Sequence, residues 1–220
     1  LYFTGGLPAP RVGLVDVVGP LPGSVEAFLG VPRFLPVALF NLGPVTDRLT
    51  LSIPSIAPGL TGTLEDSGGA AVTSMTLAPL AVAPPLILHA TPAVTASPGS
   101  TLNADVRACS FNQSLTNRGD YCRDAQVQVF VLALPVITEP APNATVPEVF
   151  NVAGTGPQGA TVDYLIDGVG GGSSAGTVDA TGSWRFPVSG LSAGTHSIDI
   201  SFVTMGGAAT GLSLALTVGS

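Results

Sequence analysis

Short apolar runs, separated by Gly, Pro and polar turn signals, dominate the chain. Several runs alternate between hydrophobic and polar residues, as in Asp47–Ile53, where Leu49, Leu51 and Ile53 share one face. This period of two is typical of a half-buried β-strand, and no segment keeps a helical period over ten residues. The pattern predicts a first series of strands at Arg11–Val18, Phe34–Leu42, Asp47–Ile53, Leu60–Glu65, Met75–Leu80, Leu86–Ala90, Thr101–Cys109 and Ala125–Leu134.

The segment Leu134–Pro147 contains four prolines and is interpreted as an extended domain junction. The strands after this junction alternate clearly. In His196–Val203, for example, Ile198, Ile200 and Phe202 are expected to face inward. We therefore predict an all-β chain of two sandwiches, at residues 1–134 and 135–220. The second series of strands is expected at Glu148–Ala153, Ala160–Asp167, Gly176–Ala180, Trp184–Val188, Thr195–Thr204 and Gly211–Val218.

The charge of the chain excludes one class of function. Only 10% of residues are charged, against about 25% in typical domains, and the net charge is −7. All seven basic residues are arginines and they do not cluster, so the basic patch of a nucleic-acid-binding protein is absent.

Hydrophobic residues make up 45% of the chain, yet no apolar run approaches the ~20 residues that span a bilayer. We therefore predict no membrane span and expect apolar surface at an interface. Composition drift in a GC-rich genome is the alternative explanation. The start at Leu1 shows no signal-peptide pattern, so we expect a mature, processed form.

Cys109 and Cys122 flank a polar loop, which suggests a disulfide and an oxidising compartment. Closing such a loop stabilises a fold by roughly 3 kcal/mol in the chain-entropy model. Two free thiols remain the alternative, whereas zinc binding would need four ligands. The loop also contains Arg118–Asp120, an Arg-Gly-Asp tripeptide of the kind that can engage integrins; coincidence in a polar loop is the other interpretation.

A few further residues are candidates for binding or modification. Three aspartates could converge on calcium, which takes six to eight oxygen ligands, although aspartate is also common in turns. Two sequons would be glycosylated only in a host that glycosylates. No cofactor is expected. The calcium candidates are Asp163, Asp167 and Asp179, and the sequon asparagines are Asn112 and Asn143.

The C-terminal half carries a recognisable set of motifs. They include Phe150–Thr155, Leu165–Gly168, the hairpin Asp179–Phe186 with its Asp-x-x-Gly-x-Trp pattern, and Leu191–His196. Residues 135–220 thereby resemble the bacterial Ig-like repeats of large secreted adhesins. In the N-terminal half, Val37–Gly43 together with Asp47–Leu51 resembles Ig-like modules of secreted bacterial enzymes and surface proteins. The resemblance implies two tandem immunoglobulin-like β-sandwich domains with a spacer, adhesion or assembly role; some relatives bind calcium or sugars.

Two motifs could suggest catalysis, but their context does not support it. Gly154–Gly159 fits G-x-G-x-x-G, yet Pro157 and the strand pattern after it indicate a turn rather than a strand-to-helix phosphate site. Gly172–Gly176 fits G-x-S-x-G, but Ser174 is expected in a Gly-rich hairpin loop. His89 is interpreted as a surface residue at a strand end. No nucleophile–base set is visible, so we predict that the protein is not an enzyme.

These observations favour a structural protein of the cell exterior that associates with itself into a filament, pilus-like fibre or surface layer. Sheet edges can accept strands from other chains. The N-terminal segment is a possible strand donor to a neighbour, through Leu14, Val15, Val17 and Val18. The alternative is an adhesin or carbohydrate-binding accessory module with glycans or a host surface as partner, for which Tyr121 is the loop aromatic to test first.

Overall fold

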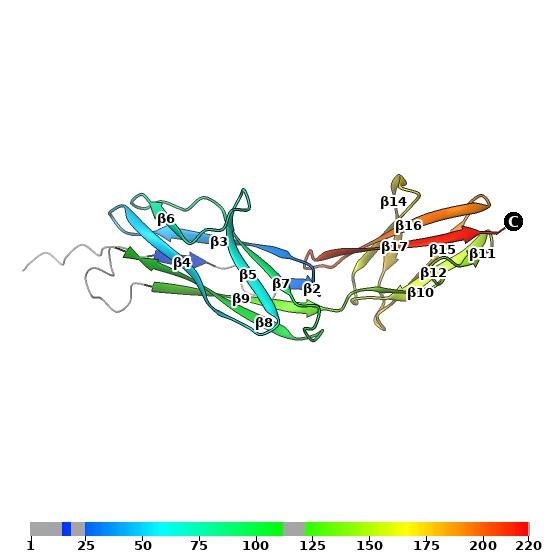
Figure 1. The fold of residues 1–220 in the computed structure, drawn as a ribbon, viewed down its shortest axis with the longest axis horizontal. Coiled ribbons are helices and arrows are strands. Elements are labelled where there is room, and N and C mark those ends of the chain that lie inside the picture. The colour runs from blue at the N-terminus through cyan, green and yellow to red at the C-terminus, as the bar shows by residue number, and fades with distance from the viewer. Residues whose placement is uncertain (1–14, 19–24, 112–121, 220) are drawn as a thin grey trace, which may run out of the picture. The chain divides into compact units, whose positions relative to one another are not determined.

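The computed structural model describes residues 15–18, 25–111 and 122–219 (Figure 1). It divides the chain into two compact units, with the main boundary after Phe130. The expected division after Leu134 stays a prediction. Within the described ranges, no helix combines the length and the apolar character needed to cross a membrane.

The first sandwich consists of two facing sheets, one of four strands and one of five. The four-stranded sheet has the order β1-β3-β7-β5, formed by Val15–Val18, Arg33–Asn41, Leu86–Pro92 and Leu60–Asp66. The five-stranded sheet has the order β2-β9-β8-β4-β6, formed by Val25–Phe28, Cys122–Leu132, Thr101–Ser110, Asp47–Ile56 and Ser74–Leu77.

The second sandwich pairs a three-stranded with a five-stranded sheet. The first has the order β10-β12-β15, formed by Val136–Glu139, Val149–Thr155 and Ser183–Ser189. The second has the order β11-β17-β16-β13-β14, formed by Thr145–Val146, Ala209–Val218, Gly194–Val203, Thr161–Ile166 and Val169–Thr177.

Both sandwiches have immunoglobulin-like topology. In each, the opening segment of the domain is divided between the two sheets, as β1 and β2 in the first and β10 and β11 in the second. In the second sandwich β11 runs parallel to the last strand, β17, while the other pairs are antiparallel. The remaining strands are distributed over the two sheets of each sandwich, as in Ig domains. The predicted fold class is confirmed.

Side-chain alternation positions both cores. In β9, Val127 and Val129 are fully buried, whereas Gln126 and Gln128 point to solvent, as the alternation predicts. In β16, Ile198, Ile200 and Phe202 are buried in the same way. Such burial of alternate strand residues provides the main driving force for packing two sheets.

Trp184 belongs to the core of the second sandwich, as expected. Its ring lies 5.4 Å from that of Phe202 in an edge-on arrangement and 6.0 Å from that of Phe186. Gly154 of β12 lies directly opposite Trp184 of β15. A Cβ atom on Gly154 would lie 2.4 Å from the indole Cζ2 and 2.0 Å from the carbonyl oxygen of Val136. Only a glycine therefore fits under the indole.

Some elements differ from the expectation. The proline-rich junction contains β10 and β11, and no sequence pattern predicts β2. The Gly-rich run Val169–Thr177 forms β14, although the sequence suggests a hairpin loop there, with a strand from Gly176 onward. Glycine has low strand propensity, but β13 supplies the hydrogen-bonding partner that overrides this preference.

Candidate functional site

The outer face of β3 is apolar, although it is not part of the core. The inward-facing residues of β3 are buried, while Phe34 on the opposite face is 59% exposed. Across the sheet, Ile87 lies opposite Pro36, and Val82, which is 60% exposed, bridges Phe40. Exposed apolar groups that lie side by side mark interaction surfaces. We call this surface the apolar strip; it comprises Phe34, Pro36, Phe40, Val82 and Ile87.

A polar group borders the apolar strip at Phe34. The ring of His89 stacks on Phe34 at a centroid distance of 4.7 Å, and His89 Nδ1 lies 3.3 Å from Glu65 Oε1. The Thr63 hydroxyl donates to the same oxygen at 2.6 Å, and this hydrogen bond is the main reason that the pKa of Glu65 is lowered. The expected strand-end position of His89 is wrong, because β7 continues to Pro92 and places the ring on the sheet face.

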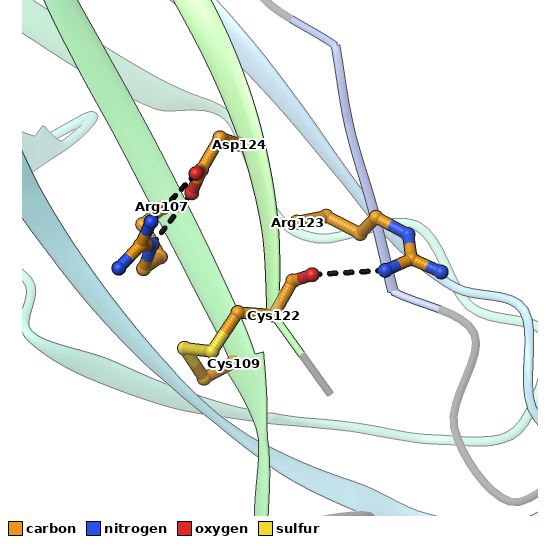
Figure 2. Close-up of a disulfide and its surroundings, with 5 residues drawn as sticks. All are labelled: Arg107, Cys109, Cys122, Arg123 and Asp124. Carbon is orange, nitrogen blue, oxygen red and sulfur yellow. Dashed lines mark hydrogen bonds and ion pairs between the residues drawn. A yellow bond between two sulfur atoms is a disulfide. The ribbon is translucent and has the colours of Figure 1, made fainter. Parts of the chain in front are cut away.

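Cys109 and Cys122 form the predicted disulfide, which joins directly opposite residues of β8 and β9 (Figure 2). Nearby on the same two strands, Arg107 donates two hydrogen bonds of 2.7 Å to the carboxylate of Asp124. The guanidinium lowers the pKa of Asp124 through these bonds. A covalent and an ionic cross-strand pair thus hold the hairpin together.

The loop between the two cysteines contains several sequence candidates. Asn112, Arg118–Asp120 and Tyr121 lie outside the described residues. The other sequon asparagine, Asn143, is exposed in a turn with φ of 62°, and its backbone N–H donates to the carbonyl oxygen of Ala215. Its side chain is therefore accessible for modification.

The three calcium candidates do not come together. Asp163 lies within β13, and Asp167 directly follows the end of that strand. Asp179 follows the end of β14, which pairs with the start of β13. Each turn aspartate already has protein donors: Asp167 accepts from Ser197, and Asp179 accepts from Thr181 and Ser183. In the described part of the chain no group of three acidic, histidine or cysteine side chains could hold a metal ion. The three aspartates therefore do not form one calcium site.

His196 and Asp167 form an ion pair that no local sequence pattern indicates. His196 Nδ1 lies 2.7 Å from Asp167 Oδ2, and Nε2 lies 2.9 Å from the carbonyl oxygen of Ser192. Both partners are acceptors, so the ring must carry two protons to satisfy them. The hydrogen bond to Asp167 raises the pKa of His196, and the same bond lowers the pKa of Asp167.

This geometry bears on the two catalytic motifs. Ser174 pairs with Asp163 in β14 rather than occupying a strand-to-helix turn, and Nε2 of His196 is taken by a carbonyl instead of a nucleophile. Gly154–Gly159 begins within β12 and ends in a turn before β13, where Gly159 has a φ of 76°. The motif is therefore followed by a strand and not by a helix N-terminus. Neither motif has the context its chemistry requires.

The segment predicted as a strand donor has a partner in its own chain. Val15–Val18 forms β1, which pairs antiparallel with Asn41–Ala38 of β3. Leu14 lies outside the described residues. Donation of Val15, Val17 and Val18 to a neighbour would require this pairing to break, and the donor role stays a prediction.

Comparison with known proteins adds little beyond the fold. No family model and no curated protein matches the chain. Structural neighbours include the fibronectin(III)-like modules of Clostridium thermocellum CbhA, at 16% identity and TM-score 0.35, covering 92% of this chain and 94% of that one. A fragment of intimin is 12% identical, with TM-score 0.34 and coverage of 94% and 100%. A three-Ig fragment of titin is 13% identical, with TM-score 0.35 and coverage of 96% and 66%. Similarities this low support no functional conclusion. The strand topology itself defines the chain as two tandem Ig-like β-sandwiches.

Proposed function

We propose that this protein is a non-catalytic structural module of the cell exterior that associates with copies of itself into a filament or surface array. The apolar strip is the observation that carries this proposal. Monomeric proteins rarely expose large contiguous apolar patches, and here neighbouring apolar side chains are exposed on a chain with only 10% charged residues. Few charges are thus available to keep copies apart.

The disulfide supports an extracellular location. Bonds such as Cys109–Cys122 persist in oxidising compartments and are rare in the cytosol, where thiols are kept reduced. This bond closes the β8–β9 hairpin of the first sandwich, so it stabilises the fold only where it stays oxidised.

Light scattering and electron microscopy of the purified chain test the proposal. We expect the average mass to rise with concentration. The double variant Phe34→Ser/Val82→Ser should weaken association by at least about tenfold, because each apolar side chain contributes roughly 1.5–3 kcal/mol when buried. Val94→Ser is the matched control, since Val94 is 72% exposed but lies in the turn after β7 and is not part of the strip. A wild-type chain that stays monomeric at every concentration would refute the proposal.

One observation favours carbohydrate binding as a second candidate. Phe34 is exposed and stacks on His89, which in turn lies 3.3 Å from the carboxylate of Glu65, and a sugar uses both an aromatic ring and hydrogen-bonding groups. Glycan-array binding that is lost in both Phe34→Ala and Glu65→Gln would support this candidate. Wild-type protein that binds no glycan on the array would exclude it for the sugars tested.

A further inference from the structure

A hollow lies on the outer face of the five-stranded sheet in the second sandwich. Its volume is about 470 Å³, and it spans β13, β16 and β17. Two cross-strand rows line it: Asp163, Ser201 and Gly211 form one row, and Leu165, Asp199 and Ser213 form the other. Small residues on β16 and β17 leave the sheet surface open between the carboxylates.

Neither the backbone nor the packing of the domain requires the glycine at position 211. Gly211 does not have a left-handed φ, and a Cβ atom there would meet only the carbonyl oxygen of Ile200, at 3.4 Å. Glycine within a strand weakens that strand and often marks a place where another backbone or a ligand approaches closely. Gly211 therefore indicates an occupant that is not part of this domain.

The charge around the hollow indicates what the occupant carries. Among the described residues, neither Asp163 nor Asp199 forms an ion pair. Residues 131–220 contain six carboxylates but one arginine, Arg185, which lies on β15 of the opposite sheet. The other six arginines of the chain all precede residue 131. The hollow thus has an unbalanced negative charge, and the matching positive charges lie in the first half of the chain.

We propose that the hollow receives Arg48 from the first sandwich of a second copy of this chain. Arg48 is exposed on β4, opposite Thr76 of β6, and no ion pair to it forms among the described residues. Its neighbours along β4 on that face, Thr50 and Ser52, are small, and the disulfide and the Arg107–Asp124 pair lie opposite them on β8 and β9. An arginine side chain matches a carboxylate in two-pronged geometry, and its stem can cover Leu165.

Such a contact joins two different surfaces, so it is head-to-tail. Interfaces of this kind leave one donor and one acceptor free at the ends and extend into open chains unless the geometry closes a ring. A five-stranded sheet with strands of about seven residues presents a face of roughly 24 by 23 Å, or about 1,100 Å² buried in total. This area is near the lower limit for a specific interface, so each contact is weak and assembly depends on concentration.

This contact rests on the proposed self-association, and sedimentation velocity of the full chain over a concentration series tests it. We expect Asp199→Arg and Arg48→Ala each to weaken association at least tenfold, and high salt to weaken the wild type. Mixing the two variants is the decisive experiment. Both variants also carry Phe34→Ser/Val82→Ser, which removes association through the apolar strip. Asp199→Arg keeps its Arg48 and Arg48→Ala keeps its hollow, so the mixture should form a dimer and nothing larger.

Controls separate the possible failures. Arg185→Ala removes the same charge from the other sheet and should associate like the wild type. Asp199→Asn repeats the test with a milder change. Trp184 fluorescence reports that the Asp199 and Arg185 variants are folded, and circular dichroism with thermal unfolding reports it for Arg48→Ala. If the wild type associates but the Asp199 and Arg48 variants associate equally well, the hollow is not the interface, although self-association stands. If the Arg185 variant is impaired instead, the assignment of Arg48 is wrong. A monomeric wild type would overturn both proposals.

Discussion

Replacing Gly154 with alanine adds one methyl group at the most crowded point of the second sandwich. The added Cβ would lie 2.0 Å from the carbonyl oxygen of Val136 and 2.4 Å from Cζ2 of Trp184. Real Cβ contacts are not this short, so either β10 or the indole must move. The oxygen belongs to a paired backbone and the indole is packed against Phe202, so neither can move freely.

The size of the effect can be worked out from this geometry. Overpacking a tight core costs typically 1–3 kcal/mol, occasionally more. One of the two obstacles is backbone, so we expect the upper part of this range, about 3 kcal/mol. In a domain of 60–100 residues, each kcal/mol shifts the Tm by about 4–8 °C, so the Tm of the second sandwich should fall by ~12–24 °C.

Thermal unfolding followed by tryptophan fluorescence measures this shift in the relevant domain, because Trp184 is the one tryptophan of the chain. Gly211→Ala provides a matched control with the same chemical change in the same sandwich. Its Cβ has space and its backbone is ordinary, so this variant should be neutral or gain about 0.5 kcal/mol. A Tm for Gly154→Ala within about 2 °C of the wild type would show that the strands can make room for the methyl group at little cost, and would refute the reasoning.

Two further predictions concern the ion pair and the disulfide. Because the pKa of His196 is raised in the folded state, the ion pair stabilises the fold at pH values below the ordinary histidine pKa, and this stabilisation is lost as the pH rises. Because the pKa of Asp167 is lowered, its contribution is present above the ordinary aspartate pKa and is lost as the pH falls. The Tm difference between wild type and His196→Gln should therefore be largest from about pH 4 to 6.5 and fade on both sides; a constant difference would contradict this. Cys109→Ser/Cys122→Ser should lose roughly 3 kcal/mol in denaturant unfolding, and reductant should then have no effect on the variant.

The candidate surfaces are only partly visible in the sequence. β3 is apolar on both faces, so its alternation could not reveal that Leu35 is buried and Phe34 exposed; the partner sheet decides this. The hollow combines residues from three strands, and no local pattern places Asp199 opposite Ser213 or Ser201 opposite Gly211. His196 and Asp167 are likewise brought together only by the pairing of β13 with β16.

The sequence by itself determined the class of fold and predicted the disulfide, with two free thiols as the alternative. Alternating residues such as Val127 and Gln126 specify which side of a strand is buried because a strand has a period of two, and two cysteines allow one intramolecular pairing. The tertiary structure decided the conformation of the Gly-rich segment and the positions of the candidate aspartates. β14 forms through a run of glycines because it pairs with β13. The three aspartates stay apart because Asp163 lies within β13, whereas Asp167 and Asp179 lie beyond its two ends. Both features depend on which strands pair with one another, and the hydrophobic pattern within a strand does not specify its partner.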